Sequence, residues 1–206
     1  MNIYIMNFFS IDCSTDLGSL FIKIKNKTFS KTLQSDKSNN DLLMKQILDF
    51  FAEKNVKFED ITCIFVNQGP GNFSGLRGSL AVAKGICLSK NISLWGYNTF
   101  LWSCVKFFSK KNGIYSLIKF NNKYFIKKFE KNLRSNLKFE EITEDEIIKK
   151  YRDQLIVIPK NFRRHFGKKI LNLDNVNIAD LDHNDLEFLR LKGLLDEELI
   201  KPLYLS

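Results

Sequence analysis

The sequence predicts an α/β protein with mixed β-sheets, and three observations lead to this prediction. Apolar and polar residues alternate over residues 19–25 and 28–34, which is typical of half-exposed strands. A continuous apolar run at 61–66 is typical of a buried strand. Apolar residues recur at helical spacing over 39–54, and 75–89 is a second predicted helix that is rich in small residues.

The predicted elements of the first half follow one another in the order β-β-β-α-β-α-β. Residues 3–11 are the first strand, 92–95 the last, and a further helix follows at 99–108. Ser38 or Asn40 is placed to cap the helix at 39–54. This order of elements is that of a ribonuclease-H-like or actin-like module, a layered α/β fold with a mixed sheet.

The second half shows weaker patterns. Residues 113–119 and 123–129 predict a hairpin that turns at Asn121-Asn122. A helix at 143–151 begins with Thr143 followed by Glu146, which is a capping-box pattern. The other predicted elements are a short strand at 155–158 ended by Pro159, a helix at 183–193 with Gly193 near its end, and an extended tail at 202–205.

Length and composition narrow the class of protein. A chain of 206 residues with 44% apolar residues is long enough for one large or two small domains with a buried core. No apolar run approaches the roughly 20 residues that span a bilayer, and the N-terminus has no signal-peptide pattern, so we expect a cytoplasmic protein. The two histidines stand far from the four scattered cysteines, so no metal site is predicted.

The net charge of +9 is concentrated in the middle of the chain. Residues 106–169 contain 18 basic and 7 acidic side chains, whereas residues 170–206 contain 3 and 8. A basic block of this kind attracts phosphates and nucleic acid. The same excess also follows from a composition rich in Lys, Asn, Phe and Ile, so an RNA-facing patch and compositional drift are both open. The candidate patch consists of Lys127, Lys128, Arg163 and Arg164.

A glycine-rich loop links the buried strand at 61–66 to the helix at 75–89. Its glycines permit close backbone approach, and Asn72 or Ser74 is placed to cap the helix. The start of a helix attracts anions, and Arg77 stands one turn in, where it can hold a phosphate or a carboxylate. A strand-to-helix corner with no ligand is the alternative. The spacing matches neither a Walker loop nor a dinucleotide-binding fingerprint.

The loop also carries a resemblance to a known family. Gly69-Pro70-Gly71-Asn72-Phe73-Ser74-Gly75-Leu76-Arg77, followed by Ala83-Lys84-Gly85, resembles the signature of the TsaB (YeaZ) family. Ile11-Asp12-Cys13-Ser14 is similar to the family's I-D-T-S start, and Pro202-Leu203-Tyr204-Leu205 to its P-x-Y-L ending. The resemblance is strong over residues 1–100, faint over 105–195, and returns in the tail.

The resemblance implies two tandem actin-like lobes. We expect an N-terminal lobe at 1–104 and a reduced lobe at 105–206, whose last helix and tail pack back toward the first. It also implies a non-catalytic scaffold that binds a TsaD-type transferase, with a TsaE-type ATPase, for threonylcarbamoylation of the adenosine beside the anticodon in tRNA. A homodimer is the alternative pairing when the chain is alone. Any ATP, ADP or Mg²⁺ is expected only through the complex, and tRNA likewise.

Two groups of candidate site residues follow. Small and aliphatic residues on the two first-lobe helices are the expected partner interface, although both helices also serve to cover the sheet. They are Leu43, Ile47, Gly78, Ala81, Val82 and Gly85. The expected phosphate-proximal set is Asp12, Ser14, Thr15, Gly69, Gly71, Asn72, Ser74, Gly75 and Arg77.

This second set keeps open an enzymatic alternative. In actin-like ATPases an acid in the first turn positions metal and water while nearby hydroxyls contact phosphate, so Asp12 and the Gly69–Gly75 loop are the parts of a free-standing ATPase or kinase. Against a transferase, the chain has no H-x-x-x-H pair, and Lys119 and Asn121 replace the family's Asp-Ala-Arg. Nothing in the sequence supplies the metal or nucleophile of a peptidase. A third alternative is an RNA-binding module that uses the basic block.

Overall fold

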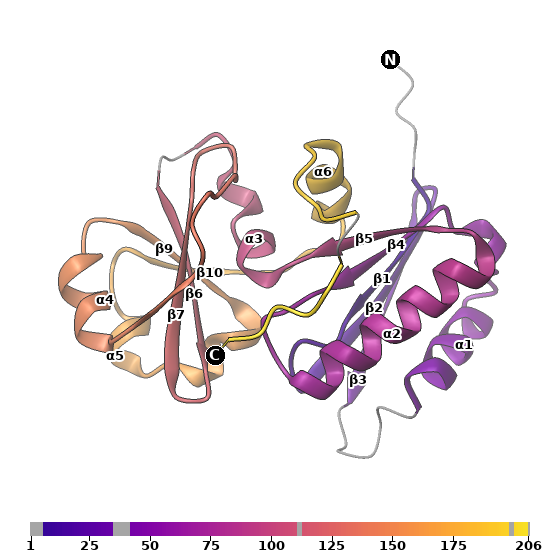
Figure 1. The fold of residues 1–206 in the computed structure, drawn as a ribbon, viewed down its shortest axis with the longest axis horizontal. Helices are drawn as coiled ribbons and strands as arrows, with labels where there is room; N and C mark the ends of the chain where they lie inside the picture. Colours follow the sequence, from indigo (N-terminus) through magenta and orange to yellow (C-terminus); the bar gives the residue numbers. More distant parts are fainter. Residues whose placement is uncertain (1–5, 35–41, 111–112, 198–199, 206) are drawn as a thin grey trace. The chain divides into compact units, whose positions relative to one another are not determined.

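The computed structural model describes residues 6–34, 42–110, 113–197 and 200–205. The chain divides into two compact units. One takes in the chain up to Asn98 together with Leu195–Tyr204, and the other takes in Thr99–Leu194. Each unit is built on its own five-stranded mixed sheet, which confirms the predicted α/β class (Figure 1).

The first sheet has the strand order β3-β2-β1-β4-β5. Strands β1, β2 and β3 form an antiparallel meander, whereas β4 and β5 join β1 in parallel. The strands are β1 (Phe8–Asp12), β2 (Leu17–Ile24), β3 (Lys27–Gln34), β4 (Cys63–Asn67) and β5 (Ser93–Tyr97). Two helices connect them: α1 (Leu43–Glu53), followed by the short 3-10 helix η2 (Phe58–Asp60), and α2 (Phe73–Lys90).

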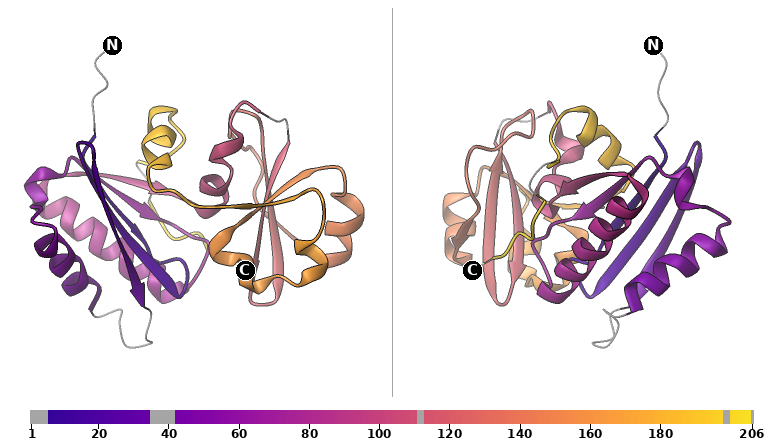
Figure 2. Two further views of the ribbon diagram at one scale, coloured as in Figure 1. Left: turned by 180° about the vertical axis from the view of Figure 1, so that it is seen from behind. Right: turned by 45° about the vertical axis from the view of Figure 1, so that its right-hand side comes forward.

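Helices α1 and α2 lie side by side on one face of the first sheet, as both views in Figure 2 show. Alternation along the strands directs Phe9, Ile11 and Ile22 toward these helices. Phe51 on α1 meets the edge of the Phe9 ring at 5.0 Å and stacks on Phe58 at 4.2 Å. Each such buried ring contributes about 1.5–3 kcal/mol, which holds α1 on the sheet.

The second unit repeats the strand plan of the first. Its sheet has the order β8-β7-β6-β9-β10, in which β6, β7 and β8 are antiparallel and β9 and β10 add in parallel. The strands are β6 (Ile114–Phe120), β7 (Lys123–Phe129), β8 (Glu140–Ile142), β9 (Leu155–Pro159) and β10 (Val176–Ala179). Its helices are α3 (Thr99–Ser103), η3 (Val105–Phe107), α4 (Glu144–Lys150), η4 (Lys160–His165), α5 (Lys168–Leu171) and α6 (Asp185–Leu191).

Comparison of the two units shows where the second is reduced. Both sheets have five strands, so the sheet is complete. The connecting helices differ: α1 has 11 residues and its counterpart α4 has 7, while α2 has 18 and its counterpart α5 has 4. The reduction therefore falls on the helical layer that covers the sheet.

Most predicted elements are present, with differences at their ends. The helix expected at 99–108 is divided, since α3 ends at Ser103 and η3 begins at Val105. The hairpin turns where predicted, with positive φ at Asn121 and Asn122. The Thr143 capping box is present at the start of α4. The expected caps Ser38 and Asn40 lie outside the described residues. None of the described helices is both long and apolar enough to cross a membrane.

Candidate functional site

The turn after β1 is built around the buried carboxylate of Asp12. Its Oδ1 accepts hydrogen bonds from the Ser14 backbone N–H at 2.8 Å and from the Asn67 side-chain amide at 3.0 Å. Asn67 ends the neighbouring parallel strand β4, and its own Oδ1 accepts the backbone N–H of Gly69 at 2.8 Å. Asp12 thus ties the first turn to the start of the glycine loop.

The glycine loop lies directly against this turn. The backbone N–H of Asn72 donates to the Ser14 carbonyl at 2.7 Å. A Cβ added at Gly71 would overlap that carbonyl, and one added at Gly75 would overlap the carbonyl of Cys13. These two glycines therefore allow the loop to pack closely on the turn, since no larger residue fits at either position. The space between the loop and the turn is filled by the protein's own backbone.

Burial also changes the protonation of the groups in the turn. Burial raises the pKa of Asp12, while the hydrogen bonds from Ser14 and Asn67 act in the opposite direction. Burial, reinforced by the Asp12 charge, raises the pKa of the Cys13 thiol to about 12. The same two causes raise the pKa of Tyr97 well above its usual value. Cys13 is thus a protonated thiol and not a nucleophilic thiolate at neutral pH.

The first turn of α2 uses its free N–H groups internally. The Asn72 side chain accepts from the backbone N–H of Ser74 and of Gly75, at 3.1 and 3.4 Å. Asn72 is thus the cap, whereas Ser74 is exposed. Arg77 lies over the Phe73 ring at 5.1 Å from its centroid. The guanidinium is held by an aromatic face and stays exposed.

The C-terminal tail completes this region of the first unit. The Gln68 side chain donates to the Lys201 carbonyl, and the Leu203 N–H donates to the Gln68 carbonyl at 2.6 Å. Tyr204 stacks on Phe73 at 5.1 Å. Gln68 and Phe73 are not among the site residues predicted from the sequence, because neither is of a residue type that by itself indicates a chemical role. The register of the tail against the loop is what gives them one.

The remaining phosphate-proximal candidates are spread around this closed corner. Thr15 donates to the carbonyl of Leu17 at 3.1 Å, and Ser14 is buried. Gly69 has φ of +106°, and the Cβ of any other residue there would stand 2.8 Å from Leu76. Over the parts of the chain that the structure describes, no three His, Cys, Asp or Glu side chains gather as metal ligands do.

The candidate interface residues divide by burial. Leu43 and Ile47 lie in the core beneath α1, so their burial removes them from the exposed surface. On α2, Ala81 and Gly85 are exposed while Gly78 and Val82 are half-buried. The large apolar side chains that α1 and α2 expose are Met44, Leu48, Phe73 and Leu88.

The four basic candidates are not brought together. Lys127 and Lys128 are neighbours on β7, so they point to opposite faces of the second sheet. Lys128 pairs with Tyr115, which in turn pairs with Ile156 at the start of β9. Arg163 and Arg164 follow the other end of β9. The positive charge of the second unit is therefore distributed over several faces.

The comparisons with known proteins match this description. A family model described as TsaD, tRNA N6-adenosine threonylcarbamoyltransferase, matches residues 33–114. Two proteins named tRNA threonylcarbamoyladenosine biosynthesis protein TsaB are similar in sequence. The one from Buchnera aphidicola subsp. Baizongia pistaciae is 30% identical over 83 residues, which are 40% of this chain and 38% of the relative. The one from subsp. Schizaphis graminum is 26% identical over 90 residues, which are 44% and 43%.

These sequence matches span about two fifths of the relatives' own length. The similarity in fold extends over more of the chain than the similarity in sequence. The solved structure of YeaZ from Pseudomonas aeruginosa superposes with a TM-score of 0.70 over 97% of this chain and 100% of that one, at 13% identity.

The two five-stranded mixed sheets with a repeated strand order define a protein of the actin-like, ribonuclease-H-like α/β class. Its glycine corner between β1 and α2 is closed by contacts of its own backbone. Within this class the chain is similar to TsaB (YeaZ) proteins, in sequence over about two fifths of its length and in fold over nearly all of it.

Proposed function

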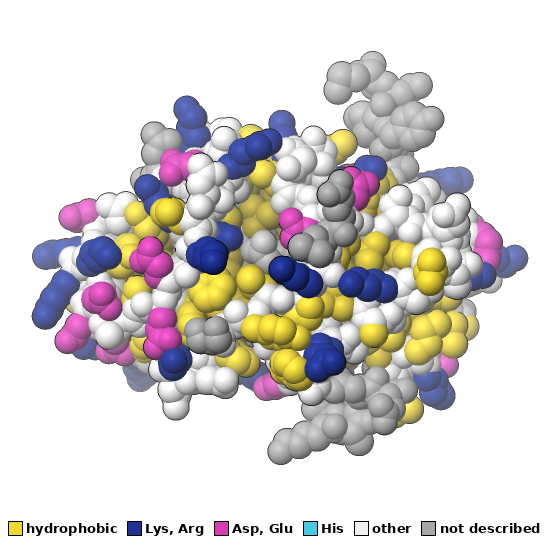
Figure 3. Space-filling model, in the orientation of Figure 1, with side chains coloured by type: hydrophobic (Ala, Val, Ile, Leu, Met, Phe, Trp, Pro, Cys, Tyr) yellow, Lys and Arg dark blue, Asp and Glu magenta, His cyan; other side chains and the backbone are white. Residues whose placement is uncertain are grey.

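We propose that the chain is a non-catalytic subunit that binds a TsaD-type transferase and thereby supports threonylcarbamoylation of the adenosine beside the anticodon in tRNA. The observation that carries the proposal is the exposed face of α1 and α2. Figure 3 shows hydrophobic side chains gathered over the region of these two helices. A face of this kind on a folded unit marks a protein-binding surface.

The exposed apolar side chains on this face are large. Leu88 is 88% exposed, Leu48 is 47% and Met44 is 37%. Met44 and Leu48 are four residues apart and therefore adjacent along α1. Complete burial of such a side chain contributes about 1.5–3 kcal/mol. A partner would recover most of that amount at Leu88 and a part of it at Met44 and Leu48.

The glycines of α2 also support a partner-binding surface. A glycine inside a helix costs about 1 kcal/mol relative to alanine. A Cβ added at Gly78 or Gly85 would meet nothing within 4 Å, so the fold of this unit does not require glycine at either position. With the exposed Ala81 between them, they leave a shallow track along which a partner helix can approach closely.

The Asp12 turn supports a role without catalysis. Asp12 is buried, and its Oδ1 accepts two internal hydrogen bonds. A metal-positioning acid in phosphoryl transfer must instead face the phosphates and their magnesium ions. The contact of the Gly71 backbone with the Ser14 carbonyl leaves no room for a phosphate between turn and loop.

The other partners follow from the same proposal. A TsaE-type ATPase joins the complex, ATP and Mg²⁺ are used there, and tRNA is bound by the complex in the cytoplasm. When the chain is alone, the same α1–α2 face pairs with a second copy. Homodimer and heterodimer then compete for one surface, so added transferase subunit dissociates the homodimer.

Co-purification tests the proposed interface. The tagged chain is expressed with the TsaD-type subunit of the same organism, as wild type and as Ala81→Glu. Ala81 is exposed, so the variant folds, but its charge is buried without a partner in the complex. Thr28→Glu, an exposed residue of the edge strand β3, is the matched control. Loss of the partner with Ala81→Glu alone is expected, and an intact Ala81→Glu complex would contradict the proposal.

A further inference from the structure

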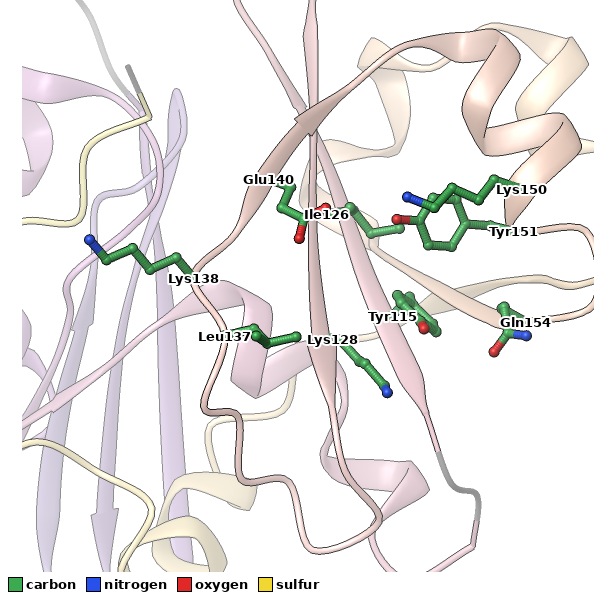
Figure 4. Close-up of a pocket in the computed structure, with 9 residues that line it drawn as sticks. All are labelled: Tyr115, Ile126, Lys128, Leu137, Lys138, Glu140, Lys150, Tyr151 and Gln154. Carbon is green, nitrogen blue, oxygen red and sulfur yellow. The ribbon is translucent and has the colours of Figure 1, made fainter.

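A pocket lies in the second unit between strands β6 and β7 of its sheet and the end of the short helix α4. Its volume is about 240 Å³. Cross-strand register places Tyr115 opposite Lys128, and Ile126 opposite Glu140, on the face of the sheet on which α4 packs. Figure 4 shows the pocket, which is lined by Tyr115, Ile126, Lys128, Leu137, Lys138, Glu140, Lys150, Tyr151 and Gln154.

Two tyrosines form the aromatic wall of the pocket. Tyr151, at the end of α4, is buried, and its ring meets that of Tyr115 edge to face at 5.1 Å. Tyr115 is half-buried and presents ring surface to the pocket. An aromatic surface of this kind is what nucleobases stack on, at about 1–3 kcal/mol per base.

The positive charges lie at opposite ends of this wall. Lys150 lies over the Tyr151 ring at 5.4 Å, whereas the Lys128 chain runs toward the other end, as Figure 4 shows. Gly113, whose φ of +70° favours glycine, lies at that second end, within van der Waals distance of Gln154, Lys128 and Tyr115. A nucleotide within a strand has a phosphate on each side of its base, which is the arrangement these lysines match.

A second groove continues from the same lysine. It has a volume of about 400 Å³ and shares Lys128 and Leu137 with the pocket. Arg134 and two asparagines, Asn132 and Asn136, also line it, and they are donors suited to further phosphates. Two acids oppose these charges. Glu130 lies 3.6 Å from the Lys128 amine, and Glu140 lies in the pocket, where it can accept from the amino group of a base.

We infer that this pocket and groove bind a single-stranded nucleic acid, with one base against Tyr115, its flanking phosphates at Lys150 and Lys128, and the strand continuing along Arg134. The inference concerns the second unit alone and stands apart from the proposed partner surface on α1 and α2. The recognised chemistry is that of a nucleotide, and a strand or a free mononucleotide can supply it.

The test measures binding by the purified full-length chain, without partners. The probes are a labelled single-stranded RNA of about eight nucleotides, which is within the usual range of site sizes, the same length of DNA, a duplex, AMP and polyglutamate. Single strands are expected to bind, with affinity that falls as salt rises. Tighter binding of the strand than of AMP assigns the site to a strand, and equal binding assigns it to a free nucleotide.

Variants locate the site. Lys150→Glu is expected to weaken strand binding about tenfold or more, since it places repulsion where a phosphate contact stood. Lys149→Glu, the exposed neighbour on α4, makes the same change of charge outside the pocket and is expected to have little effect. Tyr115→Leu is expected to weaken binding about fivefold or more through lost stacking. None of these variants changes co-purification with the transferase subunit.

Three results would overturn the inference. One is absence of single-strand binding by the wild type at low salt. Another is an equal loss with Lys149→Glu and Lys150→Glu, which would mean that general charge and not this pocket binds the strand. The third is binding of duplex or polyglutamate as tight as that of the single strand, because neither presents an unpaired base to Tyr115.

Discussion

Individual residues close the corner between β1 and α2. Asp12 accepts from Ser14 and Asn67, and Gly71 brings its backbone against the Ser14 carbonyl. The sequence predicted a tight glycine loop with a capped helix, because glycine and asparagine have strong local preferences. It did not predict that the loop seals the turn, since that depends on the distance between two segments far apart in the chain.

Two glycine substitutions compare a position where a Cβ has no room with one where it has. Gly71→Ala is expected to lower the free energy of unfolding by about 3 kcal/mol or more, because its Cβ overlaps backbone that cannot move alone. Gly85→Ala is expected to raise it by about 0.5–1 kcal/mol, because the space beside it is open. Urea unfolding of both variants checks this, and equal effects would show that the loop is not packed as described.

Asp12→Asn tests what burial does to the carboxyl group. The folded pKa of Asp12 is raised above 3.8, so the wild type loses stability as pH rises from about that value through the folded pKa. Asparagine keeps the accepting Oδ1 and carries no charge. Asp12→Asn is therefore expected to be more stable than the wild type at neutral pH, and the difference is expected to vanish as pH falls toward 3.8. Unfolding measured across pH checks this.

Asp12→Ala is the matched comparison for that experiment. It leaves the Ser14 N–H without its acceptor, at about 1–3 kcal/mol, and it leaves the Asn67 amide with only the longer contact of 3.4 Å to the Ser14 hydroxyl. It is therefore expected to be less stable than the wild type at every pH. A destabilised Asp12→Asn at neutral pH would contradict the account of the turn.

At the scale of elements, predictability follows the length of the pattern. Strands β2 and β3 show several periods of alternation, β4 lies in a continuous apolar run, and helix α1 shows helical spacing, so the sequence predicts these elements. Strand β8 has three residues and β10 has four, which is too short for a period to emerge. The sequence also could not predict which apolar residues of α1 are buried. Leu43 and Ile47 are buried and Met44 and Leu48 are exposed, but all four are apolar, so only the packed structure distinguishes them.

The cap of α2 gives a prediction for an element. Asn72→Ala removes the acceptor for two N–H groups of the first helical turn and is expected to cost about 1 kcal/mol of stability. Asn72→Asp keeps that acceptor and adds a negative charge at the positive end of the helix, so stability is expected to be retained. Thermal unfolding of both variants checks this. A loss as large for Asn72→Asp as for Asn72→Ala would show that the cap does not act through this acceptor.

At the scale of the whole molecule, one strand plan occurs twice and its helices are reduced in the second copy. The sequence shows no repeat that would predict the second copy, because the two units share the order of their strands and not their residue types. The pocket lined by tyrosines and lysines lies beside the shorter helix α4 of this second copy. In the first unit the helices are longer, and their outer face is the proposed partner surface.

Reconstituted threonylcarbamoyl transfer to tRNA tests the central claim most directly. The reaction contains the TsaD-type and TsaE-type subunits with this chain as wild type, Asp12→Asn or Ala81→Glu, and modified adenosine is quantified by mass spectrometry. If the chain is a scaffold that acts through α2, Asp12→Asn supports modification as well as the wild type, whereas Ala81→Glu abolishes it. An inactive Asp12→Asn beside a fully active Ala81→Glu would contradict the account and assign the function to the Asp12 turn.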